Sequence, residues 1–144
     1  MKTRYTSLVG VKKNIMQKRE RELQSLNVKL KNAQLALEES QNDINYIKTP
    51  QNGNISEFLA FRTLLDAQRG LIAHNQGWVE YTQNELKRAQ KQLQIDTTEY
   101  EKFNYLETTE IKKKLKEIQL KEAKDLDEVA LMTHNRKKNT EVTS

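Results

Sequence analysis

Apolar residues recur at alternating steps of three and four along two stretches of the chain, residues 16–47 and 58–103. This spacing is typical of a coiled-coil seam, in which each helix buries one apolar stripe against another helix. The seam positions of the first stretch are Met16, Arg19, Leu23, Leu26, Leu30, Ala33, Leu37, Ser40, Ile44 and Ile47. Those of the second stretch are Phe58, Phe61, Leu65, Gln68, Ile72, Asn75, Val79, Thr82, Leu86, Ala89, Leu93, Asp96, Tyr100 and Phe103. The few polar members are either tolerated imperfections or groups that fix the register of the two helices.

A polar segment that favours a turn separates the two stretches. Residues 49–54 read TPQNGN, in which Pro50 lacks an N–H and the residues around Gly53 tolerate turn geometry. A short connection makes the two helices antiparallel. We therefore predict an all-α fold, a two-helix antiparallel coiled-coil hairpin with a much longer second helix.

The predicted boundaries follow from the pattern and its breakers. The first helix covers about residues 4–48 and the turn covers 49–54. The second helix covers about 55–138, with Ser56 as its N-cap residue, and a disordered tail covers 139–144. The whole chain, residues 1–144, is expected to be a single coiled-coil domain.

The unequal helix lengths leave part of the second helix without a partner. If the chain turns near residue 51 or 52, residue n faces about residue 103 minus n, which places Tyr5 near Thr98. An overhang at 104–138 then carries an apolar stripe of its own, in a shifted register. This C-terminal stripe consists of Ile111, Leu115, Ile118, Val129 and Met132. A solitary amphipathic helix is typical of a docking element, and the alternative is that the overhang folds back as a third helix.

A second apolar track runs beside the seam on the second helix. This aromatic face consists of Ala60, Leu64, Ala67, Leu71, His74, Trp78 and Tyr81. Gly70 and Gly77 lie next to it, although a glycine inside a helix costs about 1 kcal/mol relative to alanine. The pattern indicates a surface kept smooth for contact with another protein, and the alternatives are a broader seam or a homodimer face.

Composition and charge exclude several classes of protein. Hydrophobic residues make up 35% and charged residues 31%, with four Gly and one Pro, which favours long polar helices over a sheet. The chain has no cysteine, and its two histidines are far apart, so neither a metal site nor a cofactor is expected. No nucleophile lies beside a base and there is no phosphate-binding glycine loop, which indicates a protein that is not an enzyme.

The net charge of +5 favours acidic partners. Basic residues recur on the first helix, in the overhang and in the tail, but they alternate with acidic residues and match no nucleic-acid-binding motif. We therefore expect no nucleic acid as partner, and a plain solvated face is the alternative reading of this charge. The beginning of the chain lacks the apolar run of a secretory signal, so a cytoplasmic location is expected.

The architecture as a whole resembles a known family. Two long helices, a turn one third of the way along, an aromatic-rich start to the second helix (EFLAFRTLLDAQRGLIAHNQGWVEYTQ) and a charged closing segment (KEAKDLDEVALMTHNRKK) resemble the flagellar export chaperone FliJ and its type III secretion counterpart YscO. The resemblance covers nearly the whole chain. It implies a non-catalytic component of the flagellar type III protein export apparatus, similar to the coiled-coil shaft of the rotary ATPase γ subunit.

The resemblance also implies partners. These are the hexameric ring of the export ATPase, whose assembly and activity such proteins promote, the export gate protein FlhA, and substrate-specific export chaperones. The chain alone is expected to be a monomer, and to reach the cytoplasmic face of the inner membrane peripherally, through these partners. The ATPase-ring contacts expected on this basis are Val9, Lys12, Lys13, Ile15, Ile118, Val129 and Met132. The expected export-gate contacts are Phe61, Leu64, Ala67, Leu71, His74 and Trp78.

Two other functions fit the same sequence. The first is a structural or adaptor coiled coil that homodimerises through its overhanging helix. The second is a basic nucleic-acid-binding hairpin, whose affinity would fall steeply with salt.

Overall fold

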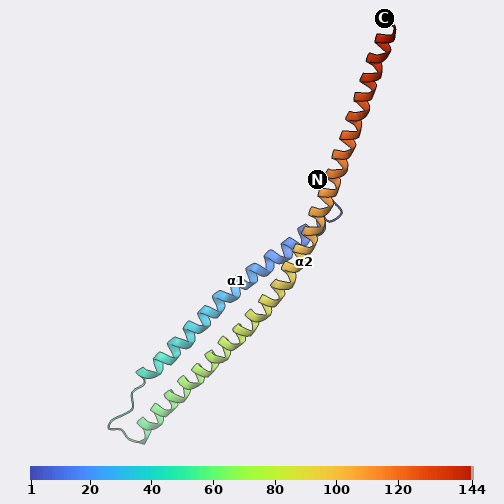
Figure 1. Cartoon of the computed structure of the whole chain (residues 1–144). Coiled ribbons are helices and arrows are strands. Elements are labelled where there is room, and N and C mark those ends of the chain that lie inside the picture. The colour runs from blue at the N-terminus through green and yellow to red at the C-terminus, as the bar shows by residue number, and fades with distance from the viewer. Residues whose placement is uncertain (144) are drawn as a thin grey trace. The chain divides into compact units, whose positions relative to one another are not determined.

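The computed structural model is all-α and describes residues 1–143, with side chains through residue 140. Helix α1 spans Thr6–Asp43, a 3-10 turn η1 spans Ile44–Tyr46, and helix α2 spans Ile55–Thr143 (Figure 1). The helices contain 38 and 89 residues and pack against each other. The predicted fold class, a pair of packed helices with a much longer second one, is therefore confirmed.

The chain divides into two compact units, and α2 contributes to both. One unit comprises Lys13–Thr98, and the other combines Met1–Lys12 with Glu99–Ser144.

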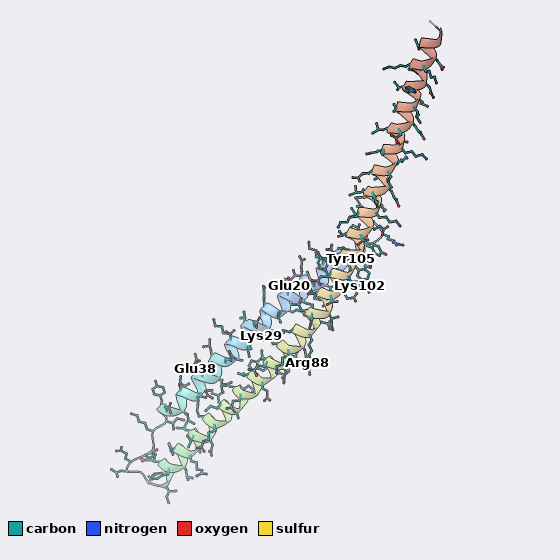
Figure 2. All side chains as sticks on the ribbon, in the orientation of Figure 1. Glu20, Lys29, Glu38, Arg88, Lys102 and Tyr105 are labelled. Carbon is teal, nitrogen blue, oxygen red and sulfur yellow. The ribbon has the colours of Figure 1, made fainter. Side chains whose placement is uncertain are left out.

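The unit of Lys13–Thr98 is a helical hairpin held together by the predicted seam. Every seam position of α1 in this unit is buried or half-buried, and so is every one of α2 except Phe58, which is 48% exposed. Charged side chains such as Glu20, Lys29 and Glu38 lie outside the seam (Figure 2). The spacing of three and four therefore identifies the contact line, because only this stripe of each helix meets the other.

The seam is thin. In the part of the chain whose side chains are described, Ala33 is the only buried apolar residue, and Ser40 and Thr82 are the buried polar ones. No large side chain there is completely enclosed. Two helices alone cover only part of each other's side chains, so the apolar stripe stays half-buried along most of its length.

Both ends of the connection differ from the prediction. Helix α1 ends at Asp43 rather than near residue 48, and it is followed by the 3-10 turn and the extended residue Ile47. The N-cap of α2 is Asn54 rather than Ser56, since the Glu57 N–H donates to Asn54 Oδ1 at 3.1 Å.

The register of the hairpin also differs from the prediction. Arg19 meets Asp96, whereas a turn at residue 51 or 52 would have placed it opposite Asn84. Residues 47–54 are not helical, and Ile47 is extended. An extended residue advances the chain by about 3.3 Å, against 1.5 Å for a residue in a helix. The connection therefore spans more length than a tight turn, and each residue of α1 faces a residue of α2 later in the sequence than expected.

The other unit pairs Met1–Lys12 with the adjoining part of α2. Thr6 meets Glu107 and Arg4 meets Glu110, so the residues that follow Phe103 are partly covered. The expected position of Tyr5 near Thr98 and an overhang that begins at residue 104 were therefore wrong. Every residue from 115 to 140 is exposed, which places the start of the uncovered part near residue 115.

Helix α2 continues through this exposed part without a break. Its end at Thr143 lies beyond the expected end near residue 138, because no Gly or Pro interrupts it, so the expected tail is helical as far as it is described. Ser144, also assigned to that tail, lies outside the described residues. The alternative of a third helix is not found within residues 1–143, since one helix accounts for the whole segment.

Candidate interaction surfaces

The aromatic face of α2 is fully open to solvent. All seven members are exposed, with Leu64 60% and Trp78 49% accessible. The rings of Trp78 and Tyr81 stack with their centroids 5.6 Å apart and their planes 21° from parallel. A methyl group built at Gly70 or Gly77 would meet no atom within 4 Å, so neither glycine is required by packing inside the chain. The broader-seam alternative is thus excluded for these side chains, which remain free for an external contact.

Of the expected gate contacts, five lie on this face and one does not. Leu64, Ala67, Leu71, His74 and Trp78 are exposed in a continuous row. Phe61 is half-buried in the seam and lines a shallow groove with Phe58 and Arg69. The structure therefore separates Phe61 from the other five. A step of three residues falls about 60° short of a full helical turn, so Leu64 lies beside the seam position that Phe61 occupies and not on it.

Two polar clusters cross the seam. In the first, Arg19 Nε donates to Asp96 Oδ2 at 3.0 Å, and Asp96 Oδ1 accepts a second hydrogen bond from Gln92 Nε2 at 3.0 Å. Arg19 also donates to Glu22 at 3.0 Å. These hydrogen bonds, to Glu22 and then to Asp96, raise the pKa of the Arg19 guanidinium.

The second polar cluster surrounds the buried Ser40. Gln68 Nε2 donates to the Ser40 carbonyl at 2.8 Å, and Asn75 Nδ2 donates to Ser40 Oγ at 3.1 Å and to the Ala36 carbonyl at 3.2 Å. Each polar seam member named here therefore has a specific partner on the other helix. This arrangement favours a role in setting the register over a tolerated imperfection, because a shifted register would leave the same groups unpaired.

The C-terminal stripe is exposed along α2 beyond residue 115. Ile118 is 46%, Val129 57% and Met132 71% accessible. A shallow groove beside them is lined by Glu122, Asp125, Leu126 and Val129. Residues 11 apart complete almost exactly three helical turns, so Ile118 and Val129 share one side of α2, with two acidic residues between them.

The remaining expected ring contacts have different surroundings. Val9 is half-buried, and Lys12 Nζ lies 3.8 Å from Glu99 Oε2 and 5.9 Å from the centre of the Phe103 ring. Lys13 and Ile15 belong to the unit of Lys13–Thr98 and are exposed there. The structure thus brings together Ile118, Val129 and Met132, whereas Lys12 already has partners within the chain.

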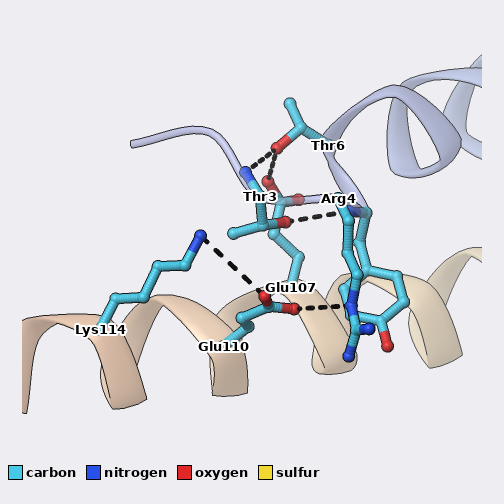
Figure 3. Close-up of polar contacts among 7 residues, drawn as sticks. Thr3, Arg4, Thr6, Glu107, Glu110 and Lys114 are labelled. Atoms are coloured by element: carbon cyan, nitrogen blue, oxygen red, sulfur yellow. Dashed lines mark hydrogen bonds and ion pairs between the residues drawn. The ribbon is translucent and has the colours of Figure 1, made fainter.

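Sequence reasoning missed a polar cluster at the beginning of the chain (Figure 3). Thr6 Oγ1 accepts a hydrogen bond from the Thr3 N–H at 2.8 Å and donates one to Glu107 Oε1 at 2.7 Å. The Tyr5 N–H donates to Thr3 Oγ1 at 3.1 Å, and Arg4 Nε lies 3.4 Å from Glu110 Oε2. The repeated threonines before the first apolar run were the available signal for a helix start, but the error in register hid their partners on α2.

Among the residues whose side chains are described, no group of three or more His, Cys, Asp or Glu is arranged to hold a metal ion. Neither helix has, within its described length, an apolar segment sufficient to cross a bilayer.

Two long helices, each with one apolar stripe packed in a shared seam, define the class of protein: a coiled-coil helical protein. The family model described as flagellar FliJ protein matches residues 1–139, and the chain belongs to this FliJ family. It is therefore a non-catalytic component of the flagellar export apparatus. No curated protein and no solved structure matches the chain.

Proposed function

We propose that this chain is a chaperone and coupling rod that binds the export ATPase ring, promotes its assembly and activity, and contacts the export gate. Membership of the FliJ family supports this role. The observation that carries the proposal is the exposed part of the C-terminal stripe, from Leu115 onward. Its apolar side chains Ile118, Val129 and Met132 are about half accessible or more. Such a stripe is stabilised when a partner covers it.

The proposed effect on the ATPase is a matter of relative affinity. A helix without a cofactor or a catalytic group takes no part in ATP hydrolysis directly. It accelerates hydrolysis if it binds the active arrangement of the ring more tightly than the inactive arrangements, because binding then shifts the population toward activity. The apolar contacts of Ile118, Val129 and Met132 supply this affinity in the proposal.

The aromatic face supports the second contact, with the export gate protein FlhA. Stacked and exposed aromatic side chains bordered by glycines allow a partner to approach the helix closely. The C-terminal stripe and the aromatic face consist of different residues of α2, so each proposed contact can be tested with separate substitutions. Escort of substrate-specific export chaperones is part of the same proposal.

ATP hydrolysis by the purified export ATPase, with and without this chain, tests the ring contact. We expect faster hydrolysis with the chain, and loss of most of this stimulation when Ile118, Val129 and Met132 are all replaced by Ser. The matched control replaces Leu120 and Leu131 by Ser. Both leucines are also exposed on α2 but lie on another side of the helix. Equal rates with and without the wild-type chain would overturn the proposal.

A further inference from the structure

We propose that Met1–Lys12 is a releasable strap on α2, whose opening lengthens the exposed apolar surface of that helix from residue 115 back to Phe103. The strap and the part of α2 that it covers belong to the same compact unit. This proposal concerns the chain itself and does not depend on the identity of any partner.

The strap is held mainly by polar contacts. The shortest is the hydrogen bond from Thr6 Oγ1 to Glu107 Oε1 at 2.7 Å, and Arg4 forms an ion pair with Glu110 (Figure 3). Lys12 forms a second ion pair with Glu99. The Arg4 side chain is 76% exposed, and exposed ion pairs contribute little to stability. The contact is polar because the apolar stripe of α2 changes register between Phe103 and Ile111. Continued steps of four and three from Phe103 fall on Glu107 and Glu110, so these two acidic residues face the strap in place of apolar ones.

Apolar packing adds little to closure. No residue of the strap is buried, whereas the other unit encloses Ala33, Ser40 and Thr82. Gly10 weakens α1 within the strap, and no neighbouring atom requires a glycine there. Segments with few buried apolar contacts open at a lower free energy than the rest of a protein. The strap therefore has the properties of a segment that opens before the hairpin does.

One atom favours the open state. Glu110 Oε2 is shielded from solvent and receives no hydrogen bond from the described residues, and Arg4 Nε at 3.4 Å is its nearest cation. A buried carboxylate oxygen without a hydrogen bond is unfavourable, and opening of the strap returns this atom to water. Closure is thus stabilised at Glu107, whereas at Glu110 the weak ion pair with Arg4 is offset by an oxygen that lacks a hydrogen bond.

Opening changes the surface that α2 presents. Phe103, Leu106 and Ile111 are half-buried in the closed state, and Leu106 lines a groove together with Arg4 and Tyr5. Release of the strap exposes these side chains directly before Leu115 and Ile118 of the C-terminal stripe. The strap therefore sets the length of apolar helix that any partner meets.

Hydrogen exchange of the full-length chain tests whether the strap opens by itself. We expect Glu107→Ala to speed exchange of amides 9–12 on the order of three- to tenfold, the effect of losing one part-buried hydrogen bond, and to leave amides 26–37 unchanged. Thr6→Val, which removes the donor and keeps Glu107, is expected to act in the same way. The matched control is Glu101→Ala, because Glu101 is exposed on the same helix.

The opposite substitution gives a second test. Glu110→Met removes the oxygen that lacks a hydrogen bond, together with its exposed ion pair to Arg4, and keeps an apolar chain of similar length. Because that ion pair contributes little, we expect exchange of amides 9–12 to slow. Unchanged exchange in both Glu107→Ala and Thr6→Val, equal acceleration of amides 26–37, or acceleration in Glu110→Met would overturn the proposal.

Thiol labelling tests whether opening exposes α2, and a chain without native cysteine makes the signal specific. A thiol introduced by Leu106→Cys should react slowly and should react severalfold faster when Glu107→Ala is added. One introduced by Leu120→Cys, at a position that is 63% exposed, should react quickly in both backgrounds. Equal labelling of Leu106→Cys with and without Glu107→Ala would show that the strap does not cover this surface.

Discussion

Arg19 on α1 and Asp96 on α2 form a hydrogen-bonded ion pair across the seam, with Nε and Oδ2 3.0 Å apart. The Asp96 side chain is 12% exposed, and its carboxylate accepts hydrogen bonds from Arg19 and Gln92. Arg19 and Asp96 both occupy seam positions, most of which hold apolar residues. It therefore favours one alignment of the two helices, at some expense of apolar contact.

Exchange of the two charges tests this role. Arg19→Asp places two carboxylates together and should lower the midpoint of thermal unfolding, because like charges repel and Asp96 loses a donor. The double variant with Asp96→Arg added should recover most of the loss, as measured by circular dichroism. Lys18→Asp makes the same charge change on an exposed neighbour and should have a much smaller effect. No recovery in the double variant would show that the pair does not act as a unit.

Enlargement of Ala33 tests the close approach of the helices. Ala33 is 3% exposed, so Ala33→Leu forces the helices apart or distorts side chains, and we expect a loss of about 1 to 3 kcal/mol in the free energy of unfolding. Denaturant titration measures this value. Ala130→Leu adds the same side chain at an exposed position of α2 and should change stability by less than about 0.5 kcal/mol. Equal effects of the two substitutions would contradict the packing described for the seam.

The proposed gate contact predicts a specific effect of Trp78. Trp78→Ala removes the largest exposed ring of the aromatic face and its stacking on Tyr81, so binding to the cytoplasmic part of the export gate should weaken at least about tenfold. Calorimetry measures the affinity, and circular dichroism should show unchanged helix content. Tyr105→Ala removes another exposed ring, outside this face, and should leave the affinity unchanged. An unaltered affinity of Trp78→Ala would exclude Trp78 from the contact.

The C-terminal stripe predicts the oligomeric state. Glu122 and Asp125 interrupt the stripe between Ile118 and Val129, and pairing with a second copy would bury these charges. We therefore expect a monomer in sedimentation at micromolar concentration, and a dimer when both acidic residues are replaced by Leu. The control is the double variant Gln119→Leu and Asn135→Leu, which should stay monomeric. A wild-type dimer would favour the alternative of a coiled-coil adaptor that pairs through this helix.

Local patterns predicted much of the fold. The seam positions, the long second helix and the exposed aromatic face follow from the step of three and four along the chain, because a helix repeats every 3.6 residues whatever surrounds it. The position of Phe61 was within reach of the same reasoning, since its step places it in the seam. The alignment of Arg19 with Asp96 was not, because it depends on the length that residues 44–54 span and on contacts between residues far apart in sequence.

The sequence by itself determined that the chain forms two long helices of unequal length, which stripe of each helix is apolar, and membership of a family whose members are not catalytic. These properties are local, since they depend on side-chain chemistry and helical spacing. Only the tertiary structure decided that Thr6 reaches Glu107, that Ser40 is enclosed by Gln68 and Asn75, and that α2 is uncovered from residue 115. A helical seam repeats along its length, so many alignments offer similar apolar contacts, and specific polar pairs together with the length of the connection select among them.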